Sequence, residues 1–473
     1  MMDSTLIGGV WSDPLARRSV TNPADGTDIG SIGYGGKAEA IAAVAAAERA
    51  LPQWAALPPR ARADLLLAGA ARLTERADEI GLLLCRESGK RLPEAVAEVR
   101  FAVEYLRWFA EEARRPIGTL HAGERPGRRQ MSMRVPAGVA VTLTPWNFPV
   151  SIQARKLAPA LAAGCTVVAR PSEQAPLAVV EMFRCLTEAG LPAGVLNLVH
   201  GPAAEITDAL LSQPAVRVVS FTGSTGVGRR IMAAAAENIV RPLLELGGDA
   251  AYVVFDDADI PAAVEGAMTA KFRNNGQSCI AANRFVVHEA VHDEFVAQFV
   301  ARISAMKIGD PAADPCPDLG PLIDAGRVEA VSAMVAEAVG AGARLASPHV
   351  AVPARGTYLA PALLTDVPAH CALATTEVFG PAAAVFRFST EDEAVALAND
   401  TRMGLAGYVY TRDAGRAWRM GERIRVGILG INDPLPSAAY TPMGGMGQSG
   451  LGREGAEDGL HEFQETRSIC QSE

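Results

Sequence analysis

The sequence predicts an α/β fold with two parallel-sheet domains. Its 473 residues are too many for a single hydrophobic core. A strand-like apolar run at 139–143 is followed by a helical stretch at 150–163 and by a second strand-like run at 166–169. This alternation is typical of a parallel sheet with crossover helices.

Amphipathic helices are predicted near the start of the chain. Leucine, alanine and charged residues recur at helical spacing over residues 38–56 and 60–115. The stretch 117–134 differs, because glycines and a proline would interrupt a helix there. Within it, the alternating residues 130–134 favour a strand.

The parallel-sheet pattern continues through 195–199 and 216–221, and a second series runs from 251–255 to 408–410. A glycine-rich turn at 222–228 follows one of these strands and leads into a helix. Backbone amides and a helix N-terminus at such a turn can bind an anion. The turn does not match the common Gly-x-Gly-x-x-Gly fingerprint, so the pattern alone also fits an ordinary tight turn.

Composition argues against several functions. With 44 basic and 53 acidic residues the formal net charge is −9, and no basic run favours nucleic acid as a partner. No apolar run approaches the roughly 18 residues of a membrane span, and the N-terminus lacks the blocks of a signal peptide, so a soluble, cytoplasmic protein is expected. The seven cysteines lack paired spacing, which predicts reduced thiols and no metal site.

The most informative stretch is 272–279, Phe-Arg-Asn-Asn-Gly-Gln-Ser-Cys. Cys279 closely follows a glycine, and we expect Asn275, Gln277 and Ser278 to surround its sulfur with polar groups, as suits a reactive thiol. A buried structural cysteine is the alternative. Three further segments favour the reactive thiol: Pro145-Trp146-Asn147-Phe148-Pro149, Leu244-Glu245-Leu246-Gly247-Gly248 and Glu377-Val378-Phe379-Gly380-Pro381.

In this order the four segments resemble those of the aldehyde dehydrogenase superfamily, and the resemblance extends from 22–24 to 450–454. It implies two Rossmann-like parallel-sheet domains, one cofactor-binding and one catalytic, plus a small β oligomerisation extension. The excursion at 117–134 would pair with the C-terminal tail of a neighbouring subunit in a homodimer or homotetramer. The implied division gives 1–116 and 136–247 to the NAD(P)-binding domain, 248–447 to the catalytic domain, and 117–135 and 448–473 to the extension.

Cys279 is the predicted nucleophile of an aldehyde oxidation. Its thiolate would add to the carbonyl, hydride would leave to a nicotinamide, and water would cleave the resulting thioester. Glu245, whose apolar neighbours would raise its pKa, fits the general base. Asn147 and the Cys279 backbone N–H would stabilise the oxyanion. The ordinary alternatives are an N-cap or surface carboxylate for Glu245 and a turn cap for Asn147.

The resemblance also implies cofactor contacts. Glu377 would bind the nicotinamide ribose, with Phe379 against the ring, and Ser224 would meet the pyrophosphate. Arg170 stands where the family usually has lysine, whereas Glu173 can accept ribose hydroxyls and repels a 2′-phosphate, so NAD is expected and NADP is possible. The full predicted set is Thr144, Pro145, Trp146, Lys156, Arg170, Ser172, Glu173, Gly223, Ser224, Leu246, Gly247, Glu377 and Phe379.

Arginines near both catalytic motifs favour an anionic substrate. Residues 154–156 and 270–274 resemble the succinate-semialdehyde dehydrogenase branch, in which two arginines and a late serine, here Arg155, Arg273 and Ser437, hold the substrate carboxylate. The expected reaction is the NAD(P)-dependent oxidation of succinate semialdehyde to succinate. For the arginines, the alternative is that they pair with acidic residues of the protein. For the function, the alternatives are a dehydrogenase of glutarate semialdehyde or of longer or aromatic aldehydes, a coenzyme-A-acylating enzyme, and a catalytically silent binding protein.

Overall fold

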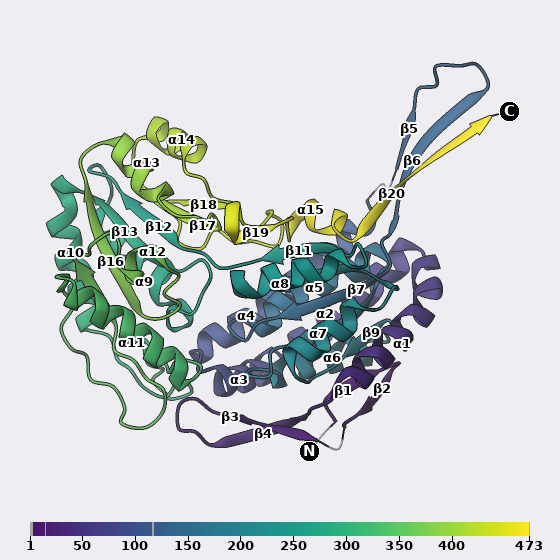
Figure 1. Cartoon of the computed structure of the whole chain (residues 1–473), viewed down its shortest axis with the longest axis horizontal. Coiled ribbons are helices and arrows are strands. Elements are labelled where there is room, and N and C mark those ends of the chain that lie inside the picture. The colour runs from purple at the N-terminus through teal and green to yellow at the C-terminus, as the bar shows by residue number, and fades with distance from the viewer. Residues whose placement is uncertain (1–2, 15, 116–117, 473) are drawn as a thin grey trace.

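Two α/β lobes and a narrow β arm are the main parts of the structure, a computed structural model that describes residues 3–14, 16–115 and 118–472 (Figure 1). Each lobe is built around one mostly parallel sheet, as the alternation of strands and helices predicts. Within the residues that the structure describes, no helix has both the length and the apolar character needed to cross a membrane.

The sheet of the first lobe has eight strands in the order β19-β11-β10-β7-β8-β9-β1-β2. Its central strands pair in parallel, while β19, β1 and β2 join antiparallel at the edges. The strands are β1 (Thr5–Ile7), β2 (Val10–Ser12), β7 (Val139–Thr144), β8 (Thr166–Pro171), β9 (Leu196–Leu198), β10 (Val216–Thr222), β11 (Arg241–Glu245) and β19 (Gly450–Leu451).

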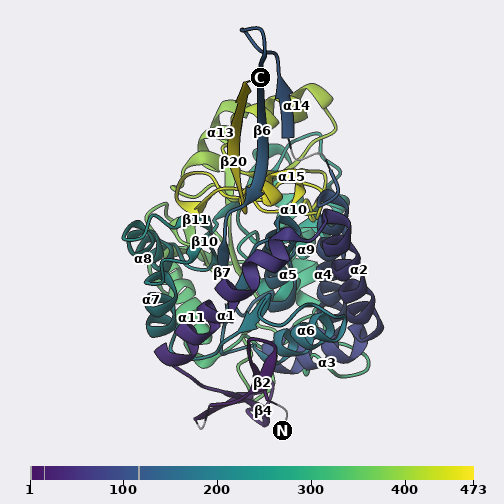
Figure 2. The same ribbon diagram turned by 90° about the vertical axis from the view of Figure 1, so that its right-hand side faces the viewer.

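Helices cover both faces of this sheet (Figure 2). On one face lie α1 (Lys37–Ala56), α7 (Ala203–Leu211) and α8 (Thr225–Ala236). On the other lie α2 (Pro59–Glu75), α3 (Ala77–Ser88), α4 (Leu92–Glu112), α5 (Pro149–Ala163) and α6 (Leu177–Glu188). The helical pattern predicted over 60–115 is therefore three helices. The break after α3 falls at Gly89, whose φ of 75° is a left-handed conformation that glycine adopts freely.

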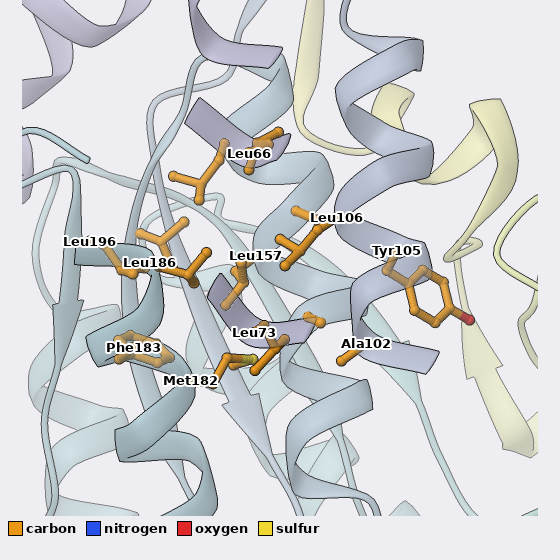
Figure 3. Packing of buried hydrophobic residues seen from close by; sticks show 14 of the residues in the cluster. Leu66, Leu73, Ala102, Tyr105, Leu106, Leu157, Met182, Phe183, Leu186 and Leu196 are labelled. Carbon is orange, nitrogen blue, oxygen red and sulfur yellow. The ribbon is translucent and has the colours of Figure 1, made fainter. Parts of the chain in front are cut away.

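Helix α5 is the centre of the first lobe's core. Every residue from Pro149 to Ala163 is buried, because α5 lies between the sheet and the outer helices. Figure 3 shows Leu157 of α5 among Leu66 of α2, Leu106 of α4 and side chains of α6. A helix packed on all sides holds its N-terminus in a fixed position, and the turn before α5 inherits that rigidity.

The second lobe has a seven-stranded sheet in the order β14-β15-β16-β13-β12-β17-β18. Its strands are β12 (Ala250–Val254), β13 (Ala282–His288), β14 (Arg344–Leu345), β15 (Ala362–Thr365), β16 (Ala382–Phe388), β17 (Ala406–Tyr410) and β18 (Ile428–Ile431). One face packs against α9 (Ile260–Phe272) and α10 (Glu289–Ser304). The other packs against α11 (Ala325–Gly340), α12 (Ala372–Thr375), α13 (Glu391–Asn399) and α14 (Ala414–Arg423).

A link of four residues, 246–249, leads from the first sheet to the second between β11 and β12. β11 ends at Glu245 and β12 begins at Ala250. The 3-10 turn η1 (Arg273–Gly276) leads to Cys279, and β13 begins soon afterwards. The end of a strand in the first sheet and the loop before a strand in the second are therefore brought together.

The arm consists of β5 (Gly118–His121), β6 (Arg128–Pro136) and the C-terminal strand β20 (Gln464–Ser472). β20 pairs with β6 along its whole length, so the chain's own tail occupies one edge of β6. The other strand of the excursion, β5, has an open edge, and the expected pairing with a neighbouring subunit stays a prediction. Residues 450–451 differ from the predicted division, because β19 extends the first sheet beside β11. The other domain boundaries stay predictions.

The remaining elements are small. β3 (Arg17–Thr21) and β4 (Asp28–Gly33) form a separate hairpin. The 3-10 turn η2 (Gly447–Ser449) and helix α15 (Ala456–His461) lie on either side of β19 and connect the second lobe to the arm.

Candidate active site

Asn147 lies in the short turn between β7 and α5. β7 ends at Thr144 and α5 begins at Pro149, a position where the fixed φ of proline suits the first helical turn. Asn147 is only 3% exposed, and its Nδ2 donates to the backbone carbonyl of Gln277 at 3.2 Å. The turn of the first lobe is therefore in direct contact with the loop that carries Cys279.

Side-chain amides hold the Cys279 loop in a left-handed backbone conformation. Asn274 and Asn275 have φ of 53° and 59°, a region that asparagine tolerates better than most residues. The Nδ2 of Asn275 donates to the carbonyl of Gly89 at 2.9 Å, and its Oδ1 accepts from the N–H of Gly320 at 2.8 Å. The loop is thus tied to both lobes.

Ser278 lines the same pocket as Cys279, as expected of a polar neighbour, whereas the amides of Asn275 and Gln277 bind backbone groups. The Oε1 of Gln277 accepts from the backbone N–H of Ile323 at 2.9 Å, and the Ser278 hydroxyl accepts from the N–H of Ile280 at 3.4 Å. These side chains bind backbone groups because tightly turned loops leave buried N–H and C=O groups that need partners. Their role is to fix the loop.

Cys279 opens on a pocket of about 360 Å³ lined by residues of both lobes. The apolar lining is Ala97, Phe101, Phe148, Ile152, Ile280, Leu435 and Met443. The polar lining is Glu94, Glu98, Ser151, Arg155, Arg273, Ser278 and Ser437. A mostly apolar pocket with a few charged groups suits a small organic molecule with a polar end.

The thiol of Cys279 is protonated at neutral pH. Burial raises its pKa to about 12, with a further contribution from the carboxylates of Glu377 and Glu245. The guanidinium groups of Arg155 and Arg273 act in the opposite direction but do not outweigh burial. Nucleophilic attack by this sulfur therefore requires that its proton be removed or that a nearby positive charge be added.

Glu245 is a buried carboxyl group with no fixed partner. It ends β11, is 1% exposed, and neither carboxyl oxygen accepts a hydrogen bond from the described residues. Burial raises its pKa to about 7, and the nearby carboxylate of Glu454 adds to the effect. A carboxyl group that titrates near neutrality can take and release protons at physiological pH, as a general base must.

Two glycines let this strand end approach the second lobe. A Cβ on Gly248 would lie 2.1 Å from the carbonyl oxygen of Cys279, and a Cβ on Gly247 would lie 2.7 Å from Oε2 of Glu377. The N–H of Gly248 donates to Oε1 of Glu377 at 3.1 Å. Burial raises the pKa of Glu377 to about 7. Any side chain at either glycine would push these groups apart.

Aromatic rings of the two lobes are in contact. Phe379 has a φ of 51°, and its ring meets that of Trp146 edge to face at 5.4 Å. Such a strained backbone persists only where surrounding contacts hold it. Pro145 is partly exposed beside them, whereas the hydroxyl of Thr144 is buried and donates to Oε1 of Gln153 at 3.0 Å. The Thr144 side chain therefore points into the first lobe.

The glycine-rich turn after β10 presents a helix N-terminus. Ser224 is exposed and caps α8, while the N–H of Gly223 donates to the carbonyl of Glu245 at 3.0 Å. Leu246 is buried directly against Gly228 of α8. The N-terminus of α8 therefore lies next to the end of β11, which is a suitable place for a phosphate.

Charged residues lie at the carboxyl end of β8. The guanidinium of Arg170 donates to the carboxylate of Glu173 and to the carbonyl of Gly201 at 2.9 Å. Arg18 approaches the carboxylate of Glu173 at 3.8 Å. Ser172, which precedes Glu173, is buried. Arg170 and Glu173 thus neutralise one another, so neither charge acts alone on a ligand at this position.

Arg273 and Arg155 differ in their surroundings. Arg273 lies over the ring of Phe148 at 5.1 Å, and it forms no ion pair with the carboxylates that the structure describes. The Nε of Arg155 is 2.6 Å from a carboxylate oxygen of Glu454. The alternative that these arginines pair with acids of the protein therefore holds for Arg155 and not for Arg273. Ser437 lines the same pocket.

Comparison with known proteins places this geometry in a family. A sequence profile described as "Aldehyde dehydrogenase family" matches residues 11–469, nearly the whole chain. The chain belongs to the aldehyde dehydrogenase family. The resemblance found in the sequence and the predicted fold are both confirmed.

Curated and solved relatives agree with this assignment. The enzyme is 42% identical over 469 residues to a glutarate-semialdehyde dehydrogenase of Pseudomonas aeruginosa, covering 98% of this chain and 96% of that one. It is 42% identical over 467 residues to a succinate-semialdehyde dehydrogenase [NADP(+)] of Escherichia coli, covering 98% and 97%. The crystal structure of a Staphylococcus aureus betaine aldehyde dehydrogenase in complex with NAD+ superposes with a TM-score of 0.96 at 32% identity, covering 100% and 95%.

Sequence reasoning missed one buried residue of the enzyme, Glu454. Its carboxylate lies 2.5 Å from Nζ of Lys156, accepts from the Ser220 hydroxyl at 3.1 Å, and pairs with Arg155. Burial alone would raise the pKa of Glu454, but these two cations hold it below its ordinary value. Glu454 ends the 450–454 segment that carries the family resemblance. A glutamate close to several glycines was the only sign in the sequence that it has a role.

Lys156 was predicted to contact the cofactor, and its position does not support that contact. The side chain has no exposed surface, and its ammonium donates to Ser220 and Glu454. It lies under the sheet because α5 packs directly against β7 and β8. Lys156 instead supplies positive charge near Glu245, whose pKa it lowers.

Proposed function

We propose that this enzyme oxidises a small aldehyde with an anionic end, with succinate semialdehyde as the first candidate and glutarate semialdehyde as the alternative. The observation that carries the proposal is Arg273, a cation without a carboxylate partner among the described residues, in the same pocket as Cys279. A partly desolvated guanidinium favours a bidentate carboxylate. Relatives named for both semialdehydes support the same substrate class.

NAD or NADP would bind between the end of β11 and the second lobe and accept hydride. The residues present fit such a molecule: the N-terminus of α8 at Ser224 for phosphate, Glu377 for ribose, and Phe379 with Trp146 at the ring end. A side chain at Gly226 would meet no atom within 4 Å, so the turn leaves room for a ligand. When bound, the oxidised nicotinamide supplies a positive charge and takes two electrons with one proton.

In the first half of the reaction, the sulfur of Cys279 loses its proton and bonds to the aldehyde carbon. The carbonyl oxygen becomes an oxyanion, which Asn147 Nδ2 and the Cys279 N–H would stabilise. Collapse of this intermediate expels hydride, so the carbon is oxidised and a thioester to Cys279 remains. Burial raises the thiol pKa to about 12 in the free site, and the positive charge of a bound nicotinamide would lower it, so the thiol proton can leave to solvent and Glu245 stays free to act on water.

In the second half, Glu245 takes a proton from water, and the hydroxide equivalent adds to the thioester carbon. The carbon–sulfur bond breaks, the carboxylic acid leaves, and Cys279 regains its proton. Both oxygens of Glu245 lack partners among the described residues, so either is available to accept a proton. This base is also why a water-cleaved thioester is a better proposal than transfer to coenzyme A.

Replacing Arg273 by alanine tests the substrate proposal. We expect the KM for succinate semialdehyde to rise about 10- to 100-fold, because a charge-assisted contact contributes about 1.5–3 kcal/mol. The KM for butanal, which has the same chain length and no charge, should change less than about threefold. Arg155→Ala is the matched control: it breaks the pair with Glu454, so its losses should fall on both aldehydes. Equal losses with both aldehydes in the Arg273 variant would contradict the proposal.

Replacing Glu173 by glutamine tests the proposal that NAD is preferred. The change removes a negative charge that would face a 2′-phosphate and frees Arg170 from its ion pair. We expect the ratio of kcat/KM for NADP to that for NAD to rise at least about tenfold. Initial rates with both cofactors measure this ratio, and Glu181→Gln, a carboxylate paired on the surface of α6, is the control. An unchanged ratio would show that Glu173 does not select the cofactor.

We also propose that the enzyme is a homodimer or homotetramer located in the cytoplasm. The arm supports assembly, because β5 is an unpaired edge of its sheet and carries Leu120, which is 72% exposed. A protruding arm with an open edge is suited to pairing with another copy of the chain. The cytoplasmic location stays a prediction from the sequence.

A further inference from the structure

A buried ion pair lies directly behind the Asn147 turn. Lys90 follows the C-terminal glycine of α3, Glu98 lies on α4, and their side chains are in contact. Lys90 is 0% exposed and Glu98 is 5% exposed. Neither residue has a role in the reaction steps described above, although the Glu98 side chain reaches the rim of the pocket that contains Cys279.

Lys90 binds the backbone of the turn. Its Nζ donates to the carbonyl oxygen of Asn147 at 2.8 Å and lies 3.9 Å from the centre of the Phe148 ring. The second donor to the same carbonyl is Nδ2 of Asn274, at 2.9 Å, which also donates to Gln277. The Asn147 peptide is therefore held from the first lobe by one group and from the Cys279 loop by another.

Glu98 binds the next residues along the chain. Its Oε1 accepts from the N–H groups of Val150 and Ser151 at 3.0 and 3.2 Å. These belong to the first turn of α5, where N–H groups have no partner within the helix and where Phe148 at the N-cap supplies no side-chain acceptor. A carboxylate also interacts favourably with the positive end of the helix dipole. Glu98 therefore fixes where α5 begins.

Stability alone does not explain this ion pair. Removing two charges from water is costly, and exchanging a buried pair for apolar residues of similar volume is often neutral or stabilising. What an apolar pair could not do is hold the carbonyl of Asn147 and the two N–H groups that follow it in the first turn of α5. The contacts of the pair are concentrated on the backbone that orients the Asn147 side chain.

We propose that Lys90 and Glu98 are positioning residues for the oxyanion, acting through Asn147. The pair sets the direction of the Asn147 amide toward the site above Cys279 without touching substrate. The inference rests on the proposed role of Asn147 and deepens it. A displacement of about 1 Å in such a donor can cost about 100-fold in rate, so small movements of the turn have large effects.

The test is a double-mutant cycle between Lys90→Met and Asn147→Ala, measured as the single-turnover rate of hydride transfer at saturating cofactor. Methionine keeps the volume of the lysine stem and removes the donor. In the wild-type background we expect Lys90→Met to lower this rate about 10- to 100-fold, while the KM for the aldehyde changes less than about threefold. In the Asn147→Ala background the same substitution should lower the rate less than about twofold, because the group that it positions is gone.

Lys271→Met is the matched control. Lys271 is also 0% exposed, and its Nζ donates to Asn283 at 3.0 Å, away from the Asn147 turn. Its effect, whatever its size, should be the same in both backgrounds. Glu98→Gln is the second variant, to be used if Lys90→Met does not fold. It keeps the shape of the side chain, and its effect should depend on Asn147 in the same way.

Three outcomes are distinguishable. In one outcome, Lys90→Met or Glu98→Gln lowers the rate by the same factor with and without the Asn147 side chain. The pair then acts only on the general structure, and the positioning proposal is wrong. If Asn147→Ala alone leaves hydride transfer unchanged, the role of Asn147 in the proposed function is wrong, and the positioning role with it. If the wild-type chain oxidises no aldehyde with either cofactor, the proposed function itself fails.

Discussion

A Cys279→Ser variant is expected to lose at least about 10⁴-fold in turnover of any aldehyde. Removing the nucleophile of a covalent mechanism typically costs several orders of magnitude, and a hydroxyl is far less acidic and less nucleophilic than a thiol. The covalent thioester should disappear as well. Cofactor binding should be unchanged, since the groups proposed to hold the dinucleotide are elsewhere.

Stopped-flow absorbance of the reduced nicotinamide measures the loss, and mass spectrometry of quenched enzyme detects the acyl adduct. Cys316→Ser is the control, because Cys316 is also partly exposed but lies by the carbonyls of Pro311 and Pro317. Turnover within about tenfold of wild type in the Cys279 variant would refute the covalent mechanism.

A Glu245→Gln variant is expected to form one acyl-enzyme per site and then stall. Hydride transfer should give a burst of reduced cofactor, after which the steady rate falls about 10²- to 10⁴-fold, the usual contribution of a general base. The neutral amide keeps the shape of the side chain but cannot take a proton from water. Mass spectrometry should then find the thioester accumulated on Cys279.

The pH dependence gives an independent check on Glu245. Burial raises the pKa of this carboxyl group to about 7, so below that pH it is protonated and cannot act as a base. Thioester hydrolysis in the wild-type enzyme should therefore rise with pH through about 7 and level off above it. The Glu245→Gln variant should lose this rise of the hydrolysis rate with pH. Glu457→Gln, on the surface of α15, should retain it. A wild-type profile that is flat from pH 6 to 8 would exclude Glu245 as the base.

The fold was predictable because its signals are local. Strand and helix patterns at 139–143, 150–163 and 166–169 appear in the structure as β7, α5 and β8 within a few residues. The turn before α5 and the loop before β13 are each encoded by a short run of neighbouring residues. Local patterns of this kind persist whatever the rest of the chain does.

Other features depend on contacts between distant segments, and the sequence did not reveal them. Glu454 meets Arg155 and Lys156 only because the C-terminal part of the chain returns to the first sheet as β19. In the sequence, the amides of Asn275 and Gln277 are close enough to Cys279 to contact its sulfur. In the structure, the left-handed turn directs them to neighbouring loops instead. Burial and pairing of charges are properties of the assembled core.

The four-residue link between β11 and β12 is a part of this enzyme whose length and residues cannot vary, unlike the walls of the substrate pocket. Because Gly248 has no room for a side chain beside Cys279, an insertion or a bulkier residue in the link would change the distance on which the chemistry depends. The pocket walls come instead from α4, α5 and the loop after β18, far away along the chain. Arg273 lies beside the reaction centre on η1, but the remaining walls can be changed to give new substrate preferences while the reaction centre is inherited intact.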